Sequence, residues 1–399
     1  MSARTGHELR IDGDLVVMVG GNSWTGPPYG QHHLARQLSQ RVPVLWVDSQ
    51  ISYLTPLNDA GAAATLREDR LRFVAPNLLR LTPVTVPGTT RPILRDVARR
   101  QARRAVRRAI DRLGARVHST IITGLGDMMD VAPGAQRVLF GTDDYVAGAE
   151  LMGIDPHWAA DMERRQLAMA DVVIAISPVL QEKWALRRPD VELLPNGCDA
   201  ERFAGADDAP LPADVRLKGP IAGFVGHMSE RIDLSMLEAV AASGASLLLV
   251  GPRQASFEIA KFDALLARPN VQWVGPKAFD DLPSYLRVID VGLTPYQQSD
   301  FNHACFPLKT LEYLAAGRPA VVSDLPAHRW LQTEHVTIAD TAEQFAARVQ
   351  ALLAASGGPQ EVDDRRAFAR RHSWAARADE LAQLLGLDAI QPATPAQAA

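Results

Sequence analysis

Residues 301–324 read FNHACFPLKTLEYLAAGRPAVVSD, and this stretch gives the first indication of the fold. Apolar, β-branched runs at residues 291–293 before it and 320–322 at its end each predict a strand. Between them we expect a helix that begins near Pro307, because proline is well tolerated in a first helical turn, and that stops at Gly317. The stretch therefore predicts one strand–helix–strand repeat of a parallel sheet.

The start of this helix carries groups suited to a phosphorylated ligand. Backbone N–H groups at the helix N-terminus, the positive end of the helix dipole and the ammonium of Lys309 all favour phosphate. Glu312, one turn further on, can accept hydrogen bonds from the two vicinal hydroxyls of a ribose. The alternative is that Lys309 and Glu312 form a solvent-exposed pair on an ordinary helix.

The same alternation of short apolar runs and helical patterns extends along the whole chain, which predicts an α/β protein with parallel sheets and crossover helices. The expected strands of a first series are residues 15–19, 42–47, 120–122, 138–140, 172–176 and 191–194. Those of a second series are residues 221–225, 247–250, 271–274, 291–293 and 320–322.

A stretch of Ala, Asp, Gly and Pro at residues 204–220 separates the two series and predicts a linker. A chain of 399 residues is long enough for two domains. We expect an N-terminal domain at 1–204, a C-terminal domain at 205–370, a helix at 371–390 that packs back towards the N-terminal domain, and a disordered tail at 391–399.

Composition narrows the classes of function. The hydrophobic fraction of 47% and charged fraction of 22% are those of a globular protein. Charged residues near the N-terminus and the lack of a long apolar run predict a cytoplasmic protein without a signal peptide. Cys198 and Cys305 have no metal-site or disulfide spacing, and no DxD-like carboxylate motif stands out in a metal-binding context, so we expect no metal.

Residues 91–112 form an intensely basic stretch, with nine arginines and apolar residues at helical spacing. We expect a cationic amphipathic helix that contacts an anionic membrane surface. A net charge of −4 and the lack of an aromatic platform argue against a nucleic-acid partner. The alternative is a core-packed helix with a solvated arginine face.

The sequence ACFPLKTLEYLAAGRPA, from Ala304 to Ala320, resembles the E-x7-E segment of glycosyltransferases of the GT-B architecture. The resemblance is greatest to the large retaining group with many bacterial enzymes of capsule, exopolysaccharide and cell-wall assembly. Glu312 matches the second, ribose-binding glutamate of that segment. Ala304 replaces the first glutamate, which contacts the transferred sugar, and Asn302 or His303 is the candidate to compensate for it.

A second match, GFVGHMSERIDLSMLE from Gly223 to Glu238, is similar to the family segment whose two cations hold the donor diphosphate. His227 occupies the position of the family's arginine, and Arg231 lies one residue before that of its lysine. Arg231 is the preferred ligand, because a guanidinium can engage phosphate oxygens in pairs. His227 is otherwise an ordinary loop histidine. The donor residues implied by the resemblance are His227, Arg231, Asn302, Phe306, Leu308, Lys309 and Glu312.

The acceptor side is implied by GGNSWTGPPYGQHHLARQL at residues 20–38, which resembles the family's glycine-rich first loop and following helix. This resemblance implies that Gly21, Asn22 and Trp24 bind the acceptor. The segments ADVVIAIS (170–177), LPNGCD (194–199) and RRHSW (370–374) also have family counterparts in the right order.

Two neighbouring carboxylates, Asp143 and Asp144, follow an expected strand, where α/β sheets place their ligands. Asp144 aligns best with an aspartate that acts as general base in some inverting GT-B glucuronosyltransferases. It would take the proton of the attacking acceptor hydroxyl. The alternative is that both carboxylates cap a helix or a turn.

The resemblance implies two Rossmann-like domains facing a cleft, and transfer of a sugar from a nucleotide diphosphate sugar to a saccharide or lipid-linked acceptor without a further cofactor. Retention of anomeric configuration is favoured over inversion. Two alternatives remain open, a nucleotide-sugar 2-epimerase on the same fold and a degenerate glycosyltransferase-like binding subunit in which Ala304 marks lost activity.

Overall fold

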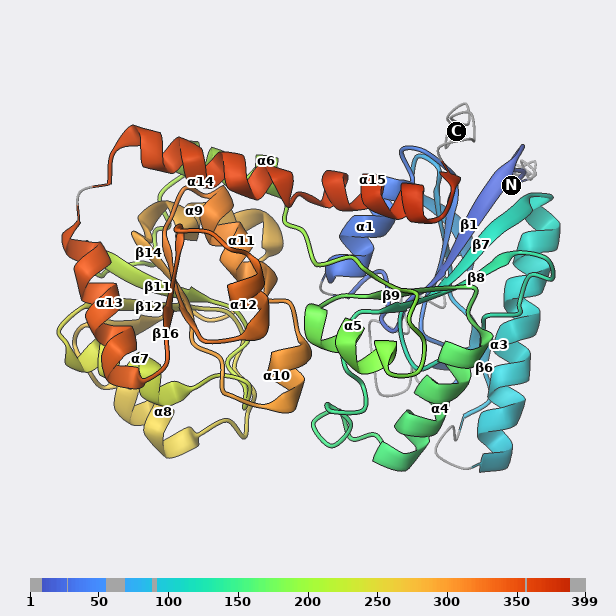
Figure 1. Cartoon of the computed structure of the whole chain (residues 1–399), viewed down its shortest axis with the longest axis horizontal. Coiled ribbons are helices and arrows are strands. Elements are labelled where there is room, and N and C mark those ends of the chain that lie inside the picture. The colour runs from blue at the N-terminus through green and yellow to red at the C-terminus, as the bar shows by residue number, and fades with distance from the viewer. Residues whose placement is uncertain (1–8, 27, 55–68, 88–91, 356, 388–399) are drawn as a thin grey trace, which may run out of the picture. The chain divides into compact units, whose positions relative to one another are not determined.

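The computed structural model describes residues 9–26, 28–54, 69–87, 92–355 and 357–387. Its chain forms two compact units (Figure 1). The bounds of unit 1 are Met1–Ile176, Leu180–Leu194 and Ala378–Ala399, and those of unit 2 are Ser177–Val179 and Pro195–Arg377.

The expected domain change at residues 204/205 lies inside unit 2. Residues from Pro195 onward already belong to that unit, because Asn196 donates a hydrogen bond to the carbonyl of Phe306 and the N–H of Cys198 donates to that of His372. The last helix joins unit 1 from Ala378 onward. The expected tail at 391–399 lies outside the described residues.

Unit 1 is built on a sheet that has eight strands in the described part of the chain, in the order β10-β9-β8-β7-β1-β2-β5-β4. Neighbouring strands are parallel, except that β4 runs antiparallel to β5. The strands of this unit are β1 Asp14–Val19, β2 Val44–Val47, β3 Ile51–Ser52, β4 Leu71–Ala75, β5 Leu78–Leu81, β6 Val84–Thr85, β7 Arg116–Ile122, β8 Gln136–Gly141, β9 Val172–Ala175 and β10 Val191–Leu193. Its helices are α1 Gly30–Leu38, α3 Pro92–Leu113, α4 Pro156–Met169, α5 Pro178–Ala185 and, at the C-terminal end, α15 Trp374–Leu384.

Unit 2 contains a fully parallel sheet whose described strands follow the order β13-β12-β11-β14-β15-β16. The strands are β11 Ile221–Val225, β12 Ser246–Val250, β13 Val271–Trp273, β14 Val291–Thr294, β15 Ala320–Ser323 and β16 Val336–Ala339. The helices are α6 Ala200–Ala204, α7 Leu234–Ala242, α8 Ile259–Leu266, α9 Leu282–Val288, α10 Asp300–Ala304, α11 Leu308–Ala315, α12 Pro326–Trp330, α13 Ala342–Ala354 and α14 Pro359–Arg371, with 3₁₀ turns η2 Gly205–Asp208 and η3 Phe279–Asp281.

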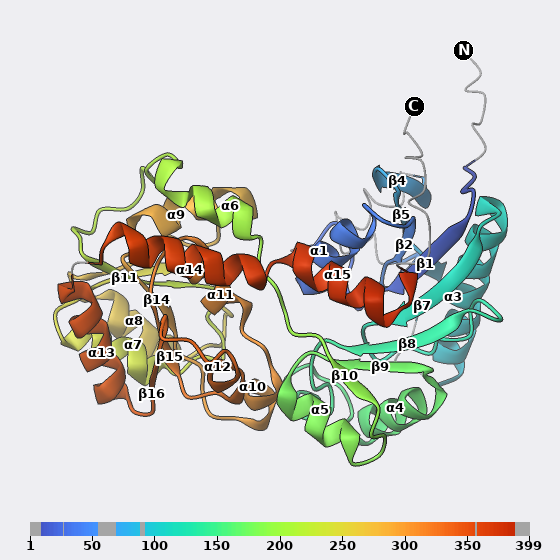
Figure 2. The same ribbon diagram turned by 45° about the horizontal axis from the view of Figure 1, so that its top comes forward.

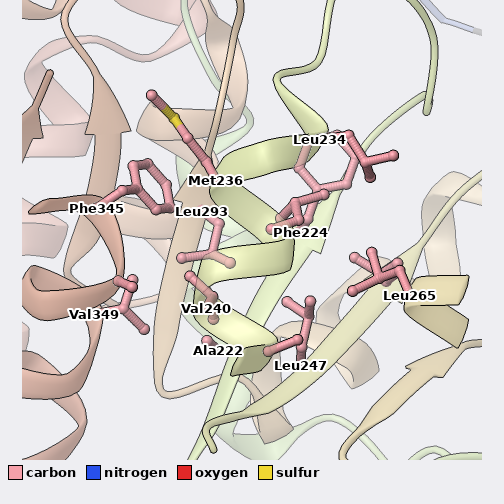
Figure 3. Close-up of a cluster of buried hydrophobic side chains, with 14 of the residues drawn as sticks. Ala222, Phe224, Leu234, Met236, Val240, Leu247, Leu265, Leu293, Phe345 and Val349 are labelled. Atoms are coloured by element: carbon pink, nitrogen blue, oxygen red, sulfur yellow. The ribbon is translucent and has the colours of Figure 1, made fainter. Parts of the chain in front are cut away.

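The central strands of both units read as continuous apolar runs, such as LVVM in β1 and LLLV in β12, and are buried throughout. Helices cover both faces of a parallel sheet, so such strands need apolar residues at successive positions and not an alternating pattern. In unit 2 one face packs against α7, α8 and α13, where Phe224 and Leu247 of the sheet meet Val240 and Phe345 of the helices (Figure 3).

Helix α11 packs on the opposite face of this sheet, beside α14 (Figure 2). Its Tyr313 ring lies against Gly292, where an added Cβ would meet the ring at 2.2 Å. The Tyr313 hydroxyl accepts a hydrogen bond from the N–H of Val225 and donates one to the carbonyl of Leu293. Glycine in β14 therefore lets a buried tyrosine fix α11 to the carboxyl ends of β11 and β14.

The expected fold class, α/β with two Rossmann-like units, is confirmed, and strands lie at all the expected positions in the described chain. The sequence reasoning missed β3, β6 and β16 and the antiparallel pair β4–β5. In β5 the polar Arg80 interrupts the apolar run. It is nevertheless buried, because Asp48 pairs with it at 2.6 Å.

Candidate functional site

Each sheet reverses its direction of winding at its centre. In unit 2, β11 leads to β12 and β13 on one side, whereas β14 leads to β15 and β16 on the other. Ligands of α/β sheets bind outside the carboxyl ends of the strands at such a switch point. The segments that follow β11 and β14 contain all of the predicted donor residues, so the fold gathers them at this edge.

Buried hydrogen bonds position α11 at the unit 2 switch point. The Thr294 and Thr310 hydroxyls are 3.1 Å apart, and Thr310 also meets Nε2 of His328 at 3.1 Å. Nδ1 of His328 lies 2.8 Å from the carbonyl of Ser323. Burial lowers the pKa of His328 to about 4, so the ring is neutral at pH 7. This series of hydrogen bonds between uncharged groups joins α11 to β14, β15 and α12.

The end of α11 agrees with the predicted stop. Gly317 has a φ of +79°, its N–H donates to the carbonyl of Leu314, and the N–H of Arg318 donates to that of Tyr313. These bonds form a Schellman motif, in which glycine supplies the left-handed residue after the helix.

Glu312 and Lys309 lie together in the first two turns of α11. Nζ of Lys309 is 2.7 Å from Oε2 of Glu312. The Glu312 side chain is only 6% exposed and that of Lys309 is 21% exposed. Burial raises the pKa of Glu312, and the Lys309 ammonium opposes that effect. The alternative of a solvent-exposed helical pair is wrong, because the carboxylate is held inside the unit.

Arg231 and Asn302 come together from the loops after β11 and β14. Nε of Arg231 donates to Oδ1 of Asn302 at 3.0 Å, and Nδ2 of Asn302 donates to the carbonyls of Arg231 and Gln297. The Arg231 guanidinium lies over the rings of Tyr296 and Phe301, at 5.3 and 4.9 Å from their centroids. Asn302 therefore uses its amide to position Arg231.

The other predicted donor residues lie in the same two segments. His227 is exposed in the loop after β11, and Leu308 is half-buried in the first turn of α11. Phe306 is buried, with its ring 5.6 Å from that of Trp330. Ala304, at the position of the missing glutamate, is buried as well.

The unit 1 switch point, between β1 and β7, opens into a cavity of about 1160 Å³. The loop after β1 lines it with Gly20, Gly21 and Asn22, and the loop after β7 lines it with Gly124 and Gly126. Two of the predicted acceptor residues, Gly21 and Asn22, thus lie at a cavity.

The third predicted acceptor residue, Trp24, is not among the lining residues. The Trp24 ring packs against the rings of His32 and Trp46, with centroids 5.3 Å apart in each case. The backbone N–H of Trp24 donates a hydrogen bond to Oδ1 of Asp48 at 2.7 Å. Asp48 also accepts hydrogen bonds from three further groups, which are Nε of Arg80, the Trp46 indole and the Thr82 hydroxyl. Trp24 helps to fix the loop around this buried aspartate.

Asp144, the predicted base, is buried and has structural partners. Its Oδ1 accepts hydrogen bonds from the N–H groups of Val146 and Ala147 and lies 2.8 Å from Nζ of Lys183. These bonds are those of a carboxylate that caps a turn, which was the alternative interpretation. The neighbouring Asp143 lines the cavity instead.

Sequence reasoning missed the part of the cavity wall that comes from α3, from α4 and from the segment that precedes α4. These residues are Arg95 of α3, Met152, Ile154, and Trp158, Met162 and Arg165 of α4. No local pattern marks them, since they come from separate parts of the chain. The Gly124-Leu125-Gly126 turn directly after an expected strand was the one signal that could have located the cavity.

Helix α3 is the predicted basic helix. Arg99 pairs with Asp127 at 2.7 Å, and Arg103 pairs with Asp130 at 2.5 Å, so part of the arginine face is neutralised. Arg100, Arg104, Arg108 and Arg112 are exposed. Of the helices in the described ranges, none is long and apolar enough to cross a membrane. Within the same ranges no group of three or more His, Cys, Asp or Glu side chains is arranged to hold a metal ion.

Residues 219–355 match the profile of a protein family described as "Glycosyl transferases group 1". TuaH of Bacillus subtilis strain 168, whose name assigns it to teichuronic acid biosynthesis as a glycosyltransferase, is 32% identical over 222 residues. The alignment covers 53% of this chain and 56% of TuaH, so the chain spans little more than half of that relative's length.

Two solved structures share the fold over most of the chain. Sucrose-phosphate synthase from Thermosynechococcus elongatus has a TM-score of 0.69 at 20% identity, covering 93% of this chain and 98% of that one. HepE of Anabaena, solved in complex with UDP-glucose, has a TM-score of 0.61 at 13% identity, covering 93% and 99%. The expected resemblance to GT-B glycosyltransferases is confirmed, by sequence over residues 219–355 and by fold over both units.

Proposed function

We propose that the protein is a glycosyltransferase that moves a sugar from a nucleotide diphosphate sugar to a saccharide or lipid-linked acceptor, in bacterial exopolysaccharide, capsule or cell-wall glycan synthesis. The observation that carries the proposal is the buried Glu312–Lys309 pair at the start of α11, within the residues that match the group 1 family. TuaH is named for cell-wall polymer synthesis, and HepE was solved with UDP-glucose, which supports a uridine diphosphate sugar as the donor.

In this proposal the donor is held by unit 2. Glu312 accepts hydrogen bonds from the ribose hydroxyls, while Lys309, Arg231 and the N–H groups at the start of α11 balance the diphosphate charge. The acceptor hydroxyl oxygen bonds to the anomeric carbon as the bond from that carbon to the diphosphate oxygen breaks. Stabilising the diphosphate as it leaves lowers the barrier, and this arrangement requires no further cofactor.

We favour retention of anomeric configuration. Inversion needs a base aligned with the acceptor hydroxyl. Asp144, the residue first expected in that role, already accepts hydrogen bonds from two backbone N–H groups and from Lys183. In a retaining transfer the hydroxyl proton passes to the leaving phosphate oxygen. Proton NMR of the anomeric signal in the product tests this point, and a product anomer opposite to that of the donor contradicts it.

A thermal-shift screen against uridine, guanosine and thymidine diphosphate sugars tests donor binding, because a ligand of the folded state raises the melting temperature by mass action. We expect one base to stabilise the protein over the others. Absence of any shift, together with absence of binding by calorimetry, contradicts the proposal.

The same ligands separate the alternatives. Conversion of the donor sugar without an acceptor indicates a 2-epimerase. Binding without hydrolysis or transfer indicates a degenerate binding subunit.

We also propose that the exposed arginine face of α3 contacts an anionic membrane surface, which would place the protein at the inner face of the cell membrane. Arg100, Arg104, Arg108 and Arg112 are four of the exposed arginines on this helix, and each such charge near an anionic surface contributes about 1 kcal/mol to binding. Flotation with vesicles that contain or lack anionic lipid tests the contact. Vesicle binding that survives replacement of Arg100, Arg104, Arg108 and Arg112 by glutamine contradicts it.

A further inference from the structure

The wall of the unit 1 cavity formed by α3 and α4 combines apolar and charged side chains. Met162 and Trp158 lie there together with the charged residues Arg95, Asp96, Arg99, Asp161 and Arg165. The Met162 thioether and the Trp158 ring offer apolar surface, and guanidinium groups bind anions. Where a guanidinium group has no carboxylate partner, this wall suits a part of the ligand that is both apolar and anionic.

Most other charged side chains of the cavity are already paired. The pairs are Arg99 with Asp96 and Asp127, Arg80 with Asp48, and Arg164 with Asp161. Within the described ranges, no ion pair joins Arg95 or Arg165 to a carboxylate. Arg95 instead lies over the Trp158 ring, 5.9 Å from its centroid. These two guanidinium groups are the ones that can balance a negative charge on a ligand.

A smaller cavity of about 170 Å³ continues from this wall. It shares Gly126, Asp127, Met162 and Arg165 with the large cavity and adds Met129, Gln166 and Met169. Its two polar uncharged or acidic side chains already have partners, because Asp127 pairs with Arg99 and the Gln166 amide donates hydrogen bonds to the carbonyls of Gly124 and Gly126. Methionine side chains are apolar and adapt to irregular shapes, so the small cavity suits a flexible hydrocarbon chain. Arg165 borders both cavities, which places a cation at the junction of the polar and apolar regions.

Other residues that line the large cavity are polar. Among them are Asn22, Ser49, Gln50 and Asp143, and each offers hydrogen-bonding groups to a saccharide. The two adjoining cavities thus offer polar groups, two guanidinium groups and methionine side chains, which are the groups that would bind a sugar joined through phosphate to a hydrocarbon.

We propose that the acceptor is a saccharide linked through a phosphate to a hydrocarbon chain, and that Arg95 and Arg165 bind this phosphate while Met162 and the small cavity hold the adjoining hydrocarbon. The inference rests on the proposed function for the saccharide part. Guanidinium groups recognise phosphate oxygens in pairs, and two of them at one border select a phosphate over a neutral group.

Calorimetry on the full chain with octyl phosphate, octyl glucoside and inorganic phosphate tests the site, with the amphiphiles kept below their micelle concentrations. Octyl phosphate should bind at least about tenfold more tightly than either other probe, which is the low end for hydrogen bonds to charged groups. The double variant Arg95→Gln, Arg165→Gln should lose at least about tenfold in octyl phosphate affinity. Arg164→Gln, an exposed neighbour outside both cavities, is the matched control and should bind as the wild type does.

Three results overturn the proposal. If octyl glucoside binds as tightly as octyl phosphate, the site does not recognise the phosphate charge. If inorganic phosphate binds as tightly as octyl phosphate, the apolar wall does not contribute to binding. The third result is that octyl phosphate does not bind, whereas the wild type binds phosphatidylglycerol vesicles and the double variant does not. That result assigns these arginines to a membrane surface.

UDP titrations of the same proteins keep the two proposals apart. Octyl phosphate binding without UDP binding contradicts the donor site alone, and UDP binding without octyl phosphate binding contradicts the acceptor site alone.

Discussion

The two switch points, β1/β7 in unit 1 and β11/β14 in unit 2, have similar strand arrangements but are held by different chemistry. In unit 1 the loop after β1 is fixed by the buried charges of Asp48 and Arg80, and it opens into a large cavity. In unit 2 the helix after β14 is fixed by a neutral hydrogen-bonded chain through Thr310 and His328. The same strand arrangement is therefore stabilised by a buried ion pair in unit 1 and by hydrogen bonds between uncharged groups in unit 2.

Removal of the Asp48 side chain should lower the stability of the folded protein more than any other change considered below. Asp48→Ala removes the carboxylate that pairs with the buried Arg80 guanidinium at 2.6 Å, and breaking a buried ion pair costs about 3 to 5 kcal/mol of unfolding free energy. Urea denaturation followed by circular dichroism measures the loss. Asp161→Ala, which breaks an exposed pair with Arg164, is the control and should cost at most about 1 kcal/mol. Similar losses in the two variants would show that the buried charge does not hold unit 1.

The buried His328 in the hydrogen-bonded series of unit 2 predicts that the unfolding free energy depends on pH. The pKa of His328 is lowered from 6.5 to about 4 in the folded protein, so protons bind the unfolded chain more readily. The stability that this histidine contributes is complete above pH 6.5 and is lost as pH falls towards 4, by about 3 kcal/mol in all.

This pH dependence is checked by comparing the unfolding free energy of the wild type and His328→Gln at pH 7 and pH 4.5. The wild type should lose more stability than the variant over this range. The lowered pKa of His372 contributes equally to both proteins and cancels. Parallel losses in the two proteins would contradict the assignment of a buried neutral histidine.

The proposed donor site predicts an effect of Glu312 on nucleotide affinity. Glu312→Ala should weaken UDP binding by about 1.5 to 3 kcal/mol, which is the scale of a hydrogen bond between a charged carboxylate and a ribose hydroxyl. Calorimetry gives the affinity. Glu361→Ala, which removes a carboxylate paired with Arg365 on α14, should leave it unchanged. Unchanged affinity in Glu312→Ala would remove the ribose assignment.

The smallest expected effect concerns the end of α11. Gly317→Ala forces a side chain into a left-handed conformation and brings its Cβ to 2.6 Å from Cγ1 of Val362. The conformational term costs about 1 to 2 kcal/mol of unfolding free energy. Gly205→Ala, at a φ of −78° with no atom within 4 Å of the new Cβ, should be nearly neutral in the same urea assay. A neutral Gly317→Ala would show that the Schellman motif is not needed.

The parts of this account that follow from sequence are local. The strand before α11, its start after Pro307 and its stop at Gly317 all lie within one short stretch, whose apolar runs, proline and glycine act on their neighbours. The partnership of Lys309 with Glu312 is also local, because residues three apart share a helix face.

The parts that did not follow depend on distant residues. Asp144 pairs with Lys183, which lies on another element, 39 residues further along the chain. The packing of Trp24 is set by Asp48, and the amide of Asn302 is engaged by the loop of Arg231. The cavity wall of unit 1 combines α3 with α4. No periodicity or spacing reveals such long-range partners.

Transfer of an isotope-labelled sugar from UDP-sugars to a bacterial lipid extract tests the central claim most directly. Full-length protein is incubated with each labelled donor, and free UDP and labelled lipid-soluble product are quantified by mass spectrometry. The account predicts that wild-type protein yields both products from at least one donor and that Glu312→Ala yields much less at the same donor concentration. Donors that bind but give neither free UDP nor labelled product would contradict it.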